Sequence, residues 1–258
     1  MIGPDGQREI AWNIPCEMPV ALVYNGLAHA VMMATPCDLQ DFALGFSIAE
    51  GIVNSGKEIS NPDIIERRNG IEINLHIPDH RLERLKLHRS RRAHMGRSGC
   101  GLCGIDNLDD AIRPLPRLGL SGEKIHVRAI LQAASVLNSA QPQRARNHTV
   151  HGAAWVSPTG KLHHIREDIG RHNALDKMIG ARIRSPRQEN EGLALVSSRC
   201  TFELVQKAAL AGISILASLS APSEAAIETA LRSHLTLVSL HEKNSECVIF
   251  TAPERIGF

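Results

Sequence analysis

A pair of cysteines two residues apart is the part of the chain best suited to chemistry. Cys100 and Cys103 stand in Ser-Gly-Cys-Gly-Leu-Cys-Gly, residues 98–104, where the flanking glycines let both sulfur atoms reach one point. A structural zinc site would need two more ligands at matching spacing, and no second Cys-x-x-Cys occurs in the sequence. A thioredoxin-like dithiol would stand between a strand and a helix, whereas an arginine-rich segment precedes this pair. Sulfur transfer through a cysteine persulfide is therefore the favoured chemistry, with two inert surface thiols as the alternative.

A basic segment leads into the cysteine pair. Residues 81–97 hold a single acid, two histidines and seven cations, which are Arg81, Arg84, Lys86, Arg89, Arg91, Arg92 and Arg97. Cations near a thiol favour the thiolate, which is the nucleophile, and they could also bind phosphate groups. A solvated, disordered loop is the alternative interpretation of this segment.

A second polar segment predicts an anion site at a helix N-terminus. Residues 166–177 read Arg-Glu-Asp-Ile-Gly-Arg-His-Asn-Ala-Leu-Asp-Lys, so a strand end is followed by a glycine and then by the opening of a helix. Backbone N–H groups at such a junction face an anion. Arg171 and Lys177 could hold phosphate, and Asp168 or Asp176 could accept a hydrogen bond from guanine or ribose. N-cap acids and surface ion pairs are the alternative.

Two further junctions place polar residues after the next strands. Residues 197–201 read Ser-Ser-Arg-Cys-Thr and residues 220–223 read Ser-Ala-Pro-Ser. Ligands of open α/β sheets bind at the carboxyl ends of the strands, so we expect one cleft that contains Arg171, His172 and Arg199. His148 and His151 precede the first strand of this region, but a lone histidine pair is more often structural, and we predict no metal site.

The elements that must position these residues differ between the two parts of the chain. In the first part we expect a hairpin of residues 20–24 and 29–33 around Asn25-Gly26, a helix that follows Thr35-Pro36 and Asp38 and ends at Glu50-Gly51, and one half-buried strand over residues 64–77. In the second part we expect helices over 127–137, 173–183, 202–211 and 223–231, and strands over 152–156, 162–166, 192–196, 213–219, 235–240 and 247–251.

This alternation predicts an α/β fold with two domains. Prolines and a glycine near residues 113–122 indicate a linker. We therefore expect a smaller α+β N-terminal domain over residues 1–118, which ends in the basic cysteine loop, and a three-layer domain with a mixed sheet over residues 119–258.

Composition excludes several functional classes. The 258 residues are 43% hydrophobic and carry a formal net charge of +2, so no global field attracts nucleic acid or a membrane surface. Aromatic residues make up only 3%, which argues against a platform that stacks single-stranded bases. No apolar run suits a signal peptide or a membrane span, and the six cysteines lack a disulfide framework, so we expect a cytoplasmic protein.

The motifs together resemble a known family. The Ser-Gly-Cys-Gly-Leu-Cys-Gly segment, residues 166–177, and Ser-Ser-Arg-Cys followed by Glu203, Val205 and Lys207 are similar to the formate dehydrogenase accessory proteins, the FdhD sulfurtransferases. The similarity extends over nearly the whole chain, and includes Thr35-Pro36, the His-Gly-Ala-Ala segment of residues 151–154 and Ser-Ala-Pro at residues 220–222.

The resemblance implies a fold, a reaction and partners. The C-terminal domain would resemble the cytidine deaminase fold. The protein would take sulfur from a cysteine desulfurase and transfer it to the molybdenum cofactor, bis-molybdopterin guanine dinucleotide, for apo formate dehydrogenase. Cys100 would carry the persulfide and Cys103 would match the second cysteine. Family members are dimers, so we expect a homodimer.

The resemblance also implies a cofactor-binding segment near the C-terminus. It falls on Leu240, His241, Glu242, Lys243, Asn244 and Ser245. These residues contain neither the Phe nor the Arg of the family pattern, so Lys243 is the one fixed cation there. The basic residues 81–97, together with Arg171 and Arg199, would supply the remaining cations for the cofactor phosphates.

Two other functions compete with sulfur transfer. A zinc nucleobase deaminase needs His-x-Glu and Pro-Cys-x-x-Cys; no His-x-Glu occurs and Gly99 precedes Cys100, which excludes that enzyme. A chaperone that delivers the cofactor without moving sulfur is the non-enzymatic alternative.

Overall fold

A four-stranded sheet forms the first part of the molecule. The computed structural model describes residues 2–3, 6–7, 13–92, 114–120, 122–186, 191–241 and 246–258. The sheet has the order β4-β3-β6-β5, with β3 (Met18–Tyr24) antiparallel to β4 (Leu27–Ala34) and parallel to β6 (Gly70–Leu75), and with β5 (Asp63–Arg67) antiparallel to β6. Two short strands, β1 (Ile2–Gly3) and β2 (Gly6–Gln7), pair with each other ahead of it.

The turns of this sheet confirm one prediction and correct another. Asn25 and Gly26 join β3 to β4 with φ angles of 48° and 78°, the left-handed conformation that this dipeptide tolerates. The single strand predicted over residues 64–77 is wrong, because Gly70, at φ 150°, opens a second strand after a tight turn. A Cβ atom at Gly70 would overlap the backbone oxygen of Pro19, so glycine is required there.

Two helices and a short 3-10 turn complete this part. The helix α1 (Leu39–Ala49) follows the predicted Thr35-Pro36 segment and ends before Gly51, whose φ is 66°. Asp38 occupies its N-cap position without a capping hydrogen bond, and lies 3.6 Å from the Nε of Arg166 instead. The turn η1 (Gly56–Glu58) precedes β5. The helix α2 (Asp79–Arg92) contains the first part of the basic segment, so the alternative interpretation as a disordered loop is wrong for residues 81–92.

A six-stranded mixed sheet forms the second part, in the order β13-β12-β11-β10-β8-β9. The parallel strands β10 (Leu193–Val196), β11 (Ile215–Ser218) and β12 (Thr236–His241) form its centre. The strands β8 (His151–Val156), β9 (Leu162–Asp168) and β13 (Glu246–Ile249) each run antiparallel to a neighbour, which confirms the predicted mixed sheet.

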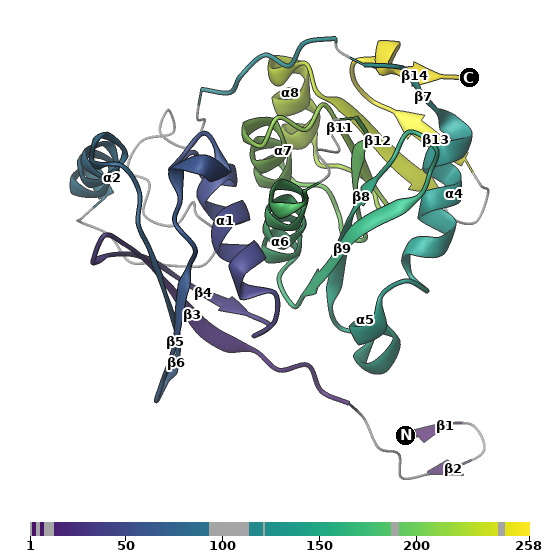
Figure 1. Ribbon diagram of the computed structural model, residues 1–258. Coiled ribbons are helices and arrows are strands. Elements are labelled where there is room, and N and C mark those ends of the chain that lie inside the picture. Colours follow the sequence, from purple (N-terminus) through teal and green to yellow (C-terminus); the bar gives the residue numbers. More distant parts are fainter. Residues whose placement is uncertain are drawn as a thin grey trace.

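Helices cover both faces of this sheet (Figure 1). On one face, α6 (Arg171–Arg184), α7 (Phe202–Leu210) and α8 (Glu224–Ser233) bury a core with the side chains of Ala153, Trp155 and Leu216. On the other face, α4 (Val127–Leu137) packs on Ala154 and Leu195, and α5 (Pro142–Asn147) follows it. The short strands β7 (Ile125–His126) and β14 (Ile256–Gly257), with the turn η3 (Pro253–Arg255), close the chain beside α4. The fold is thus a three-layer α/β sandwich with an added sheet.

The two parts meet through the helices α1 and α6. A Cβ atom at Gly45 of α1 would overlap the backbone oxygen of Asp176, and a Cβ atom at Gly180 of α6 would overlap that of Asp41. The two helix backbones therefore touch directly, which only glycine allows. The ammonium of Lys207 on α7 binds Glu50 at 2.9 Å and Asp176 at 2.8 Å, and so connects a third helix to this contact.

The predicted domain boundary at residue 118 stays a prediction. Residues 114–120 run as irregular chain between the two parts, and the backbone N–H of Leu118 donates to the carbonyl of Ser233. Within the described ranges, no helix combines the length and apolar character needed to cross a bilayer.

Candidate functional site

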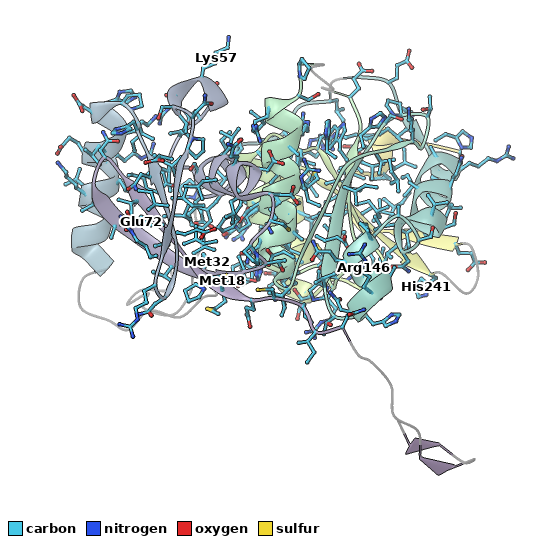
Figure 2. The ribbon with its side chains drawn as sticks, turned by 60° about the horizontal axis from the view of Figure 1, so that its bottom comes forward. Met18, Met32, Lys57, Glu72, Arg146 and His241 are labelled. Atoms are coloured by element: carbon cyan, nitrogen blue, oxygen red, sulfur yellow. The ribbon has the colours of Figure 1, made fainter. Side chains whose placement is uncertain are left out.

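The carboxyl ends of several strands meet at one edge of the six-stranded sheet, as the sequence predicted. β9, β10, β11 and β12 run in the same direction, so Asp168, Val196, Ser218 and His241 end at this edge. His151 begins the antiparallel strand β8 there and pairs with Asp168. Figure 2 brings this side of the molecule toward the reader, with His241 and Arg146 on the right of the view.

Two helices begin at this edge without a side-chain cap. Gly170 is the N-cap residue of α6 and Thr201 is that of α7, and neither provides a capping hydrogen bond. By contrast, the hydroxyl of Ser223 caps α8 by accepting from the N–H of Ala226. The first N–H groups of a helix have no partner within the helix and carry a partial positive charge, so α6 and α7 offer donors to an anion.

Basic side chains surround these two N-termini. The pKa of His151 is lowered, first because burial disfavours its charged form and then because four cationic groups repel a proton; they are Arg171, Arg144, His172 and Arg199. The guanidinium of Arg144 donates to the carbonyl of Val150, next to His151, at 3.3 Å, and the other three groups stand on the segments that follow β9 and β10, the two strands beside β8. The Nε atom of Arg171 is buried and contacts no described acceptor. The predicted cluster of Arg171, His172 and Arg199 is therefore assembled, and its role in binding stays a prediction.

A carboxylate orients one of these groups. The Nε2 of His172 lies 3.2 Å from Oε2 of Glu203, which also accepts a hydrogen bond of 2.9 Å from the hydroxyl of Thr201. Burial would raise the pKa of Glu203, but the hydrogen bonds from His172 and Thr201 and the nearby charge of Arg171 outweigh burial and lower it. Glu203 is consequently ionised and holds the imidazole of His172 at the start of α6.

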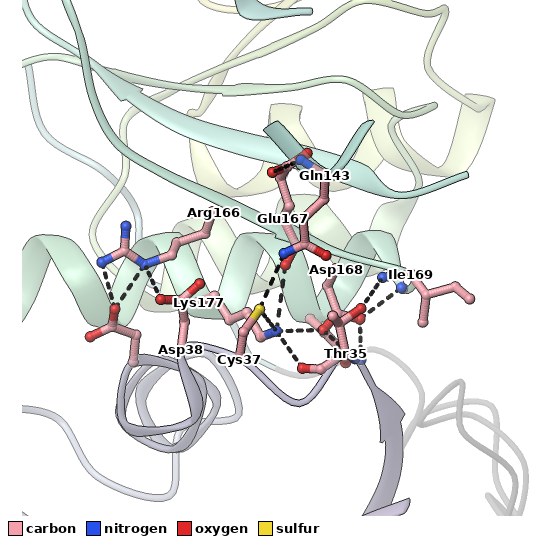
Figure 3. A network of polar contacts seen from close by, with 12 residues as sticks. Thr35, Cys37, Asp38, Gln143, Arg166, Glu167, Asp168, Ile169 and Lys177 are labelled. Atoms are coloured by element: carbon pink, nitrogen blue, oxygen red, sulfur yellow. Dashed lines mark hydrogen bonds and ion pairs between the residues drawn. The ribbon is translucent and has the colours of Figure 1, made fainter. Parts of the chain in front are cut away.

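A buried ion pair supports the loop that carries Arg171 (Figure 3). Asp168 and Lys177 have no exposed side-chain surface, and their charged atoms lie 2.7 Å apart. The other oxygen of Asp168 accepts from the N–H of Gly170 and from the side-chain amide of Asn173. The loop is thus tied to the helix that follows it.

The same ion pair also forms hydrogen bonds with the first part of the chain. The backbone N–H of Thr35 donates to Asp168 at 3.0 Å, and the ammonium of Lys177 donates to the carbonyl of Thr35 at 2.8 Å. Cys37 lies beside this pair, with its sulfur 3.7 Å from the Lys177 ammonium and 3.3 Å from the amide nitrogen of Gln143. The segment before α1 therefore helps to position the anion site.

This geometry corrects part of the predicted ligand set. Asp168 and Asp176 were candidates to accept from guanine or ribose, and Lys177 was a candidate to hold phosphate, yet all three side chains are fully buried. Asp176 is paired with Lys207, as Asp168 is with Lys177. These three predictions are wrong, because the residues stabilise the fold from within.

The C-terminal binding segment is only partly described. The side chain of Leu240 is 4% exposed and belongs to the core under α4, whereas His241 is exposed at the end of β12. Glu242, Lys243, Asn244 and Ser245 lie outside the described residues. Because four strand spacings of about 4.8 Å separate β12 from β9, His241 at the end of β12 lies about 19 Å along the edge from Asp168 at the end of β9.

The predicted sulfur-carrying residues also lie outside the described part. Cys100 and Cys103 fall between the described residues 92 and 114. Of the basic segment 81–97, residues up to Arg92 lie on α2, and Figure 1 shows α1 between α2 and α6. Arg81 is paired with Glu58 at 2.9 Å, so this arginine does not join the cations around His151.

The structure also shows a site residue that the sequence analysis missed. Arg144 lies on α5, a six-residue helix that was not predicted, and no motif pointed to it. The carboxylate of Glu167 accepts from the N–H groups of Gln143 and Arg144 and holds α5 against the strand pair. Among the described residues, no group of three or more His, Cys, Asp and Glu side chains could hold a metal ion.

Comparisons with known proteins agree on one relationship. The model of the FdhD/NarQ family matches residues 15–257. The crystal structure of a candidate formate dehydrogenase accessory protein from Desulfotalea psychrophila superimposes with a TM-score of 0.71 at 27% identity, and the match covers 99% of this chain and 96% of that one.

Proposed function

Because the chain belongs to the FdhD/NarQ family, we propose that it is an accessory protein in the maturation of formate dehydrogenase. Its solved structural neighbour, whose name describes such a role, supports this proposal. We further propose that the protein is a sulfurtransferase. In this function Cys100 takes a sulfur atom from the persulfide of a cysteine desulfurase, and the sulfur then passes to the molybdenum cofactor that apo formate dehydrogenase requires.

The cation-lined edge of the sheet is the observation that carries the cargo part of the proposal. Two helices without side-chain caps begin there, and Arg171, His172 and Arg199 lie beside them. Such an arrangement suits the diphosphate of a guanine dinucleotide, since arginine and helix N–H groups both donate to phosphate oxygens. The cargo is a substrate of the proposed reaction, and the phosphates anchor it while its metal end reacts.

The sulfur transfer can be written as two balanced steps. The Cys100 thiolate attacks the terminal sulfur of the donor persulfide, so a new S–S bond forms on Cys100 and the donor cysteine leaves as a thiolate. The Cys103 thiolate then attacks Cys100 at its inner sulfur, which forms a disulfide between the two cysteines and releases the terminal sulfur as sulfide for the cargo. The two electrons that reduce the sulfur come from the cysteine pair.

The alternative is a chaperone that binds and delivers the cargo without moving sulfur. One observation favours keeping it: the anion site among the described residues consists of cationic side chains and helix N-termini, which could bind a cargo without thiol chemistry. The predicted homodimer, the cytoplasmic location, the boundary near residue 118 and the likeness to the cytidine deaminase fold also stay predictions.

A mass measurement separates the two functions. The full-length protein is incubated with a cysteine desulfurase and cysteine, digested and analysed; a sulfurtransferase gains about 32 Da, one sulfur atom, on the peptide that contains Cys100. The Cys100→Ala variant should gain nothing and should fail to restore formate dehydrogenase activity in a deletion strain. Cys16→Ala, which removes an exposed thiol elsewhere, is the matched control and should behave as the wild type. Full restoration of formate dehydrogenase activity by Cys100→Ala would refute the sulfurtransferase function and favour the chaperone function.

A further inference from the structure

His151 stands at the centre of the cation-lined edge, although no motif assigned it a role in binding. It begins β8, is half-buried and pairs through the backbone with Asp168. Within the described ranges, its imidazole ring makes no hydrogen bond or ion pair with another side chain. Both ring nitrogens are therefore open to a ligand at this edge.

The charged groups that face His151 come from three neighbouring elements. α5 contributes Arg144, whose guanidinium donates to the carbonyl of Val150 at 3.3 Å. The loop after β10 contributes Arg199, and its Ser197 hydroxyl accepts from the N–H of Gly152 at 2.8 Å. α6 contributes Arg171 and His172 and begins three residues after Asp168, the strand partner of His151. Burial and these four groups lower the pKa of His151, so its ring is neutral at neutral pH.

The carboxylates near this edge are already engaged elsewhere. Glu203 binds His172 at 3.2 Å, and Asp168 binds Lys177 at 2.7 Å. Glu167 accepts from backbone N–H groups at the start of α5. None of these contacts places a negative charge beside His151. A bound anion would therefore supply that charge.

We propose that His151 is a ligand-binding residue that is neutral in the free protein and takes up one proton from solvent when a diphosphate binds between Arg171 and Arg199. The inference rests on the proposed function, because it concerns the same site. A bound diphosphate brings two negative charges among the cations and reverses the local field. The imidazolium then donates an N–H to a phosphate oxygen as a charge-assisted hydrogen bond.

The sign of the pH dependence follows from this order of events. The bound state holds one more proton than the free state, so lower pH favours binding. Affinity should rise as the pH falls from about 8 to about 6, by at most about tenfold per pH unit because one proton is involved. A site made only of arginines and backbone N–H groups would bind equally well across this range.

Isothermal titration of the full-length protein tests the proposal with diguanosine 5′,5′-diphosphate. Both phosphates of this probe are diesters, so the probe itself does not titrate near neutral pH. Titrations at one pH in two buffers of different ionisation enthalpy count the protons taken up. The wild type should take up a proton and gain affinity toward low pH, and His151→Gln should bind more weakly with no uptake. His163→Gln, at the opposite end of the same strand pair, is the matched control and should behave as the wild type.

The outcomes distinguish this inference from the proposed function. Binding by the wild type without proton uptake overturns the inference and leaves the anion site in place. Equal uptake by the wild type and His151→Gln, with loss of uptake in His172→Gln, also overturns it, because the proton would then sit on His172. No binding by the wild type at any pH overturns the proposed anion site as well.

Discussion

Replacement of Lys177 by methionine should destabilise the protein far more than replacement of a surface lysine. Lys177→Met keeps the length and apolar stem of the side chain but removes the ammonium, which lies 2.7 Å from the Asp168 carboxylate and 2.8 Å from the Thr35 carbonyl. Neither Asp168 nor Lys177 is exposed, so water cannot replace the lost partner. Removal of one member of a buried pair typically costs about 3–5 kcal/mol, because the remaining charge stays buried.

The hydrogen bonds that Asp168 keeps in the Lys177→Met variant reduce the expected loss of stability. Asp168 keeps three N–H donors in the variant, from Thr35, Gly170 and Asn173. A hydrogen bond to a carboxylate contributes about 1.5–3 kcal/mol, so these three donors still partly stabilise the buried Asp168 carboxylate. We therefore expect a loss near the lower limit, about 3 kcal/mol in the free energy of unfolding. For a chain of this size the melting temperature would fall by about 6–12 °C.

Urea unfolding, followed by circular dichroism, measures this loss. Lys86→Met is the matched control, because Lys86 and Glu83 form an ion pair whose side chains are 50% and 65% exposed. Such a pair contributes about 0–1 kcal/mol. Asp168→Asn combined with Lys177→Met should lose less than the sum of the two single variants, since no unpaired charge remains. A loss below about 1 kcal/mol for Lys177→Met, or strict additivity, would refute the reasoning.

Three further predictions concern other parts of the fold. Gly45→Ala should lower the free energy of unfolding in urea by about 3 kcal/mol or more, because the new Cβ overlaps a backbone oxygen of α6. Gly119→Ala is the control: a Cβ atom there meets open space, so the free energy of unfolding should change by less than about 0.5 kcal/mol. Burial raises the pKa of Cys200 to about 12, so iodoacetamide should label the exposed Cys16 in the native protein and reach Cys200 only after denaturation; equal labelling rates would contradict this. Ser223→Ala should lower the free energy of unfolding by about 1 kcal/mol through loss of the α8 cap, and an unchanged midpoint would show that the cap contributes nothing.

Much of the second part of the chain could be predicted because its periodicities are strong. The helix over residues 127–137 has the predicted bounds, and its apolar residues lie on the face buried against the sheet. The strand ends that carry Arg171 and Arg199 could be placed at one edge because parallel strands share their direction. Local pattern and connectivity were sufficient for these features.

Other features depended on contacts between residues far apart in the sequence. Asp168 and Lys177 stand in a polar segment that suggested a ligand site, yet both are buried because Thr35, more than 130 residues away, provides backbone partners. The helix α2 is rich in charged residues, and a disordered loop was the alternative interpretation of this stretch; Leu85 of α2 packs into the core of the four-stranded sheet. A polar pattern does not reveal which charged groups find a partner.

The contact between α1 and α6 also affects the order in which the chain can fold during synthesis. The helix α1 leaves the ribosome first, but α6, which packs against Gly45 of α1, ends about 135 residues later in the sequence. At translation rates of about 5–20 residues per second, α1 waits roughly 7–27 s for its partner. During that time the face of α1 that carries Gly45 lacks its partner helix. The core that α1 and α6 share can therefore form only after residue 184 has been synthesised.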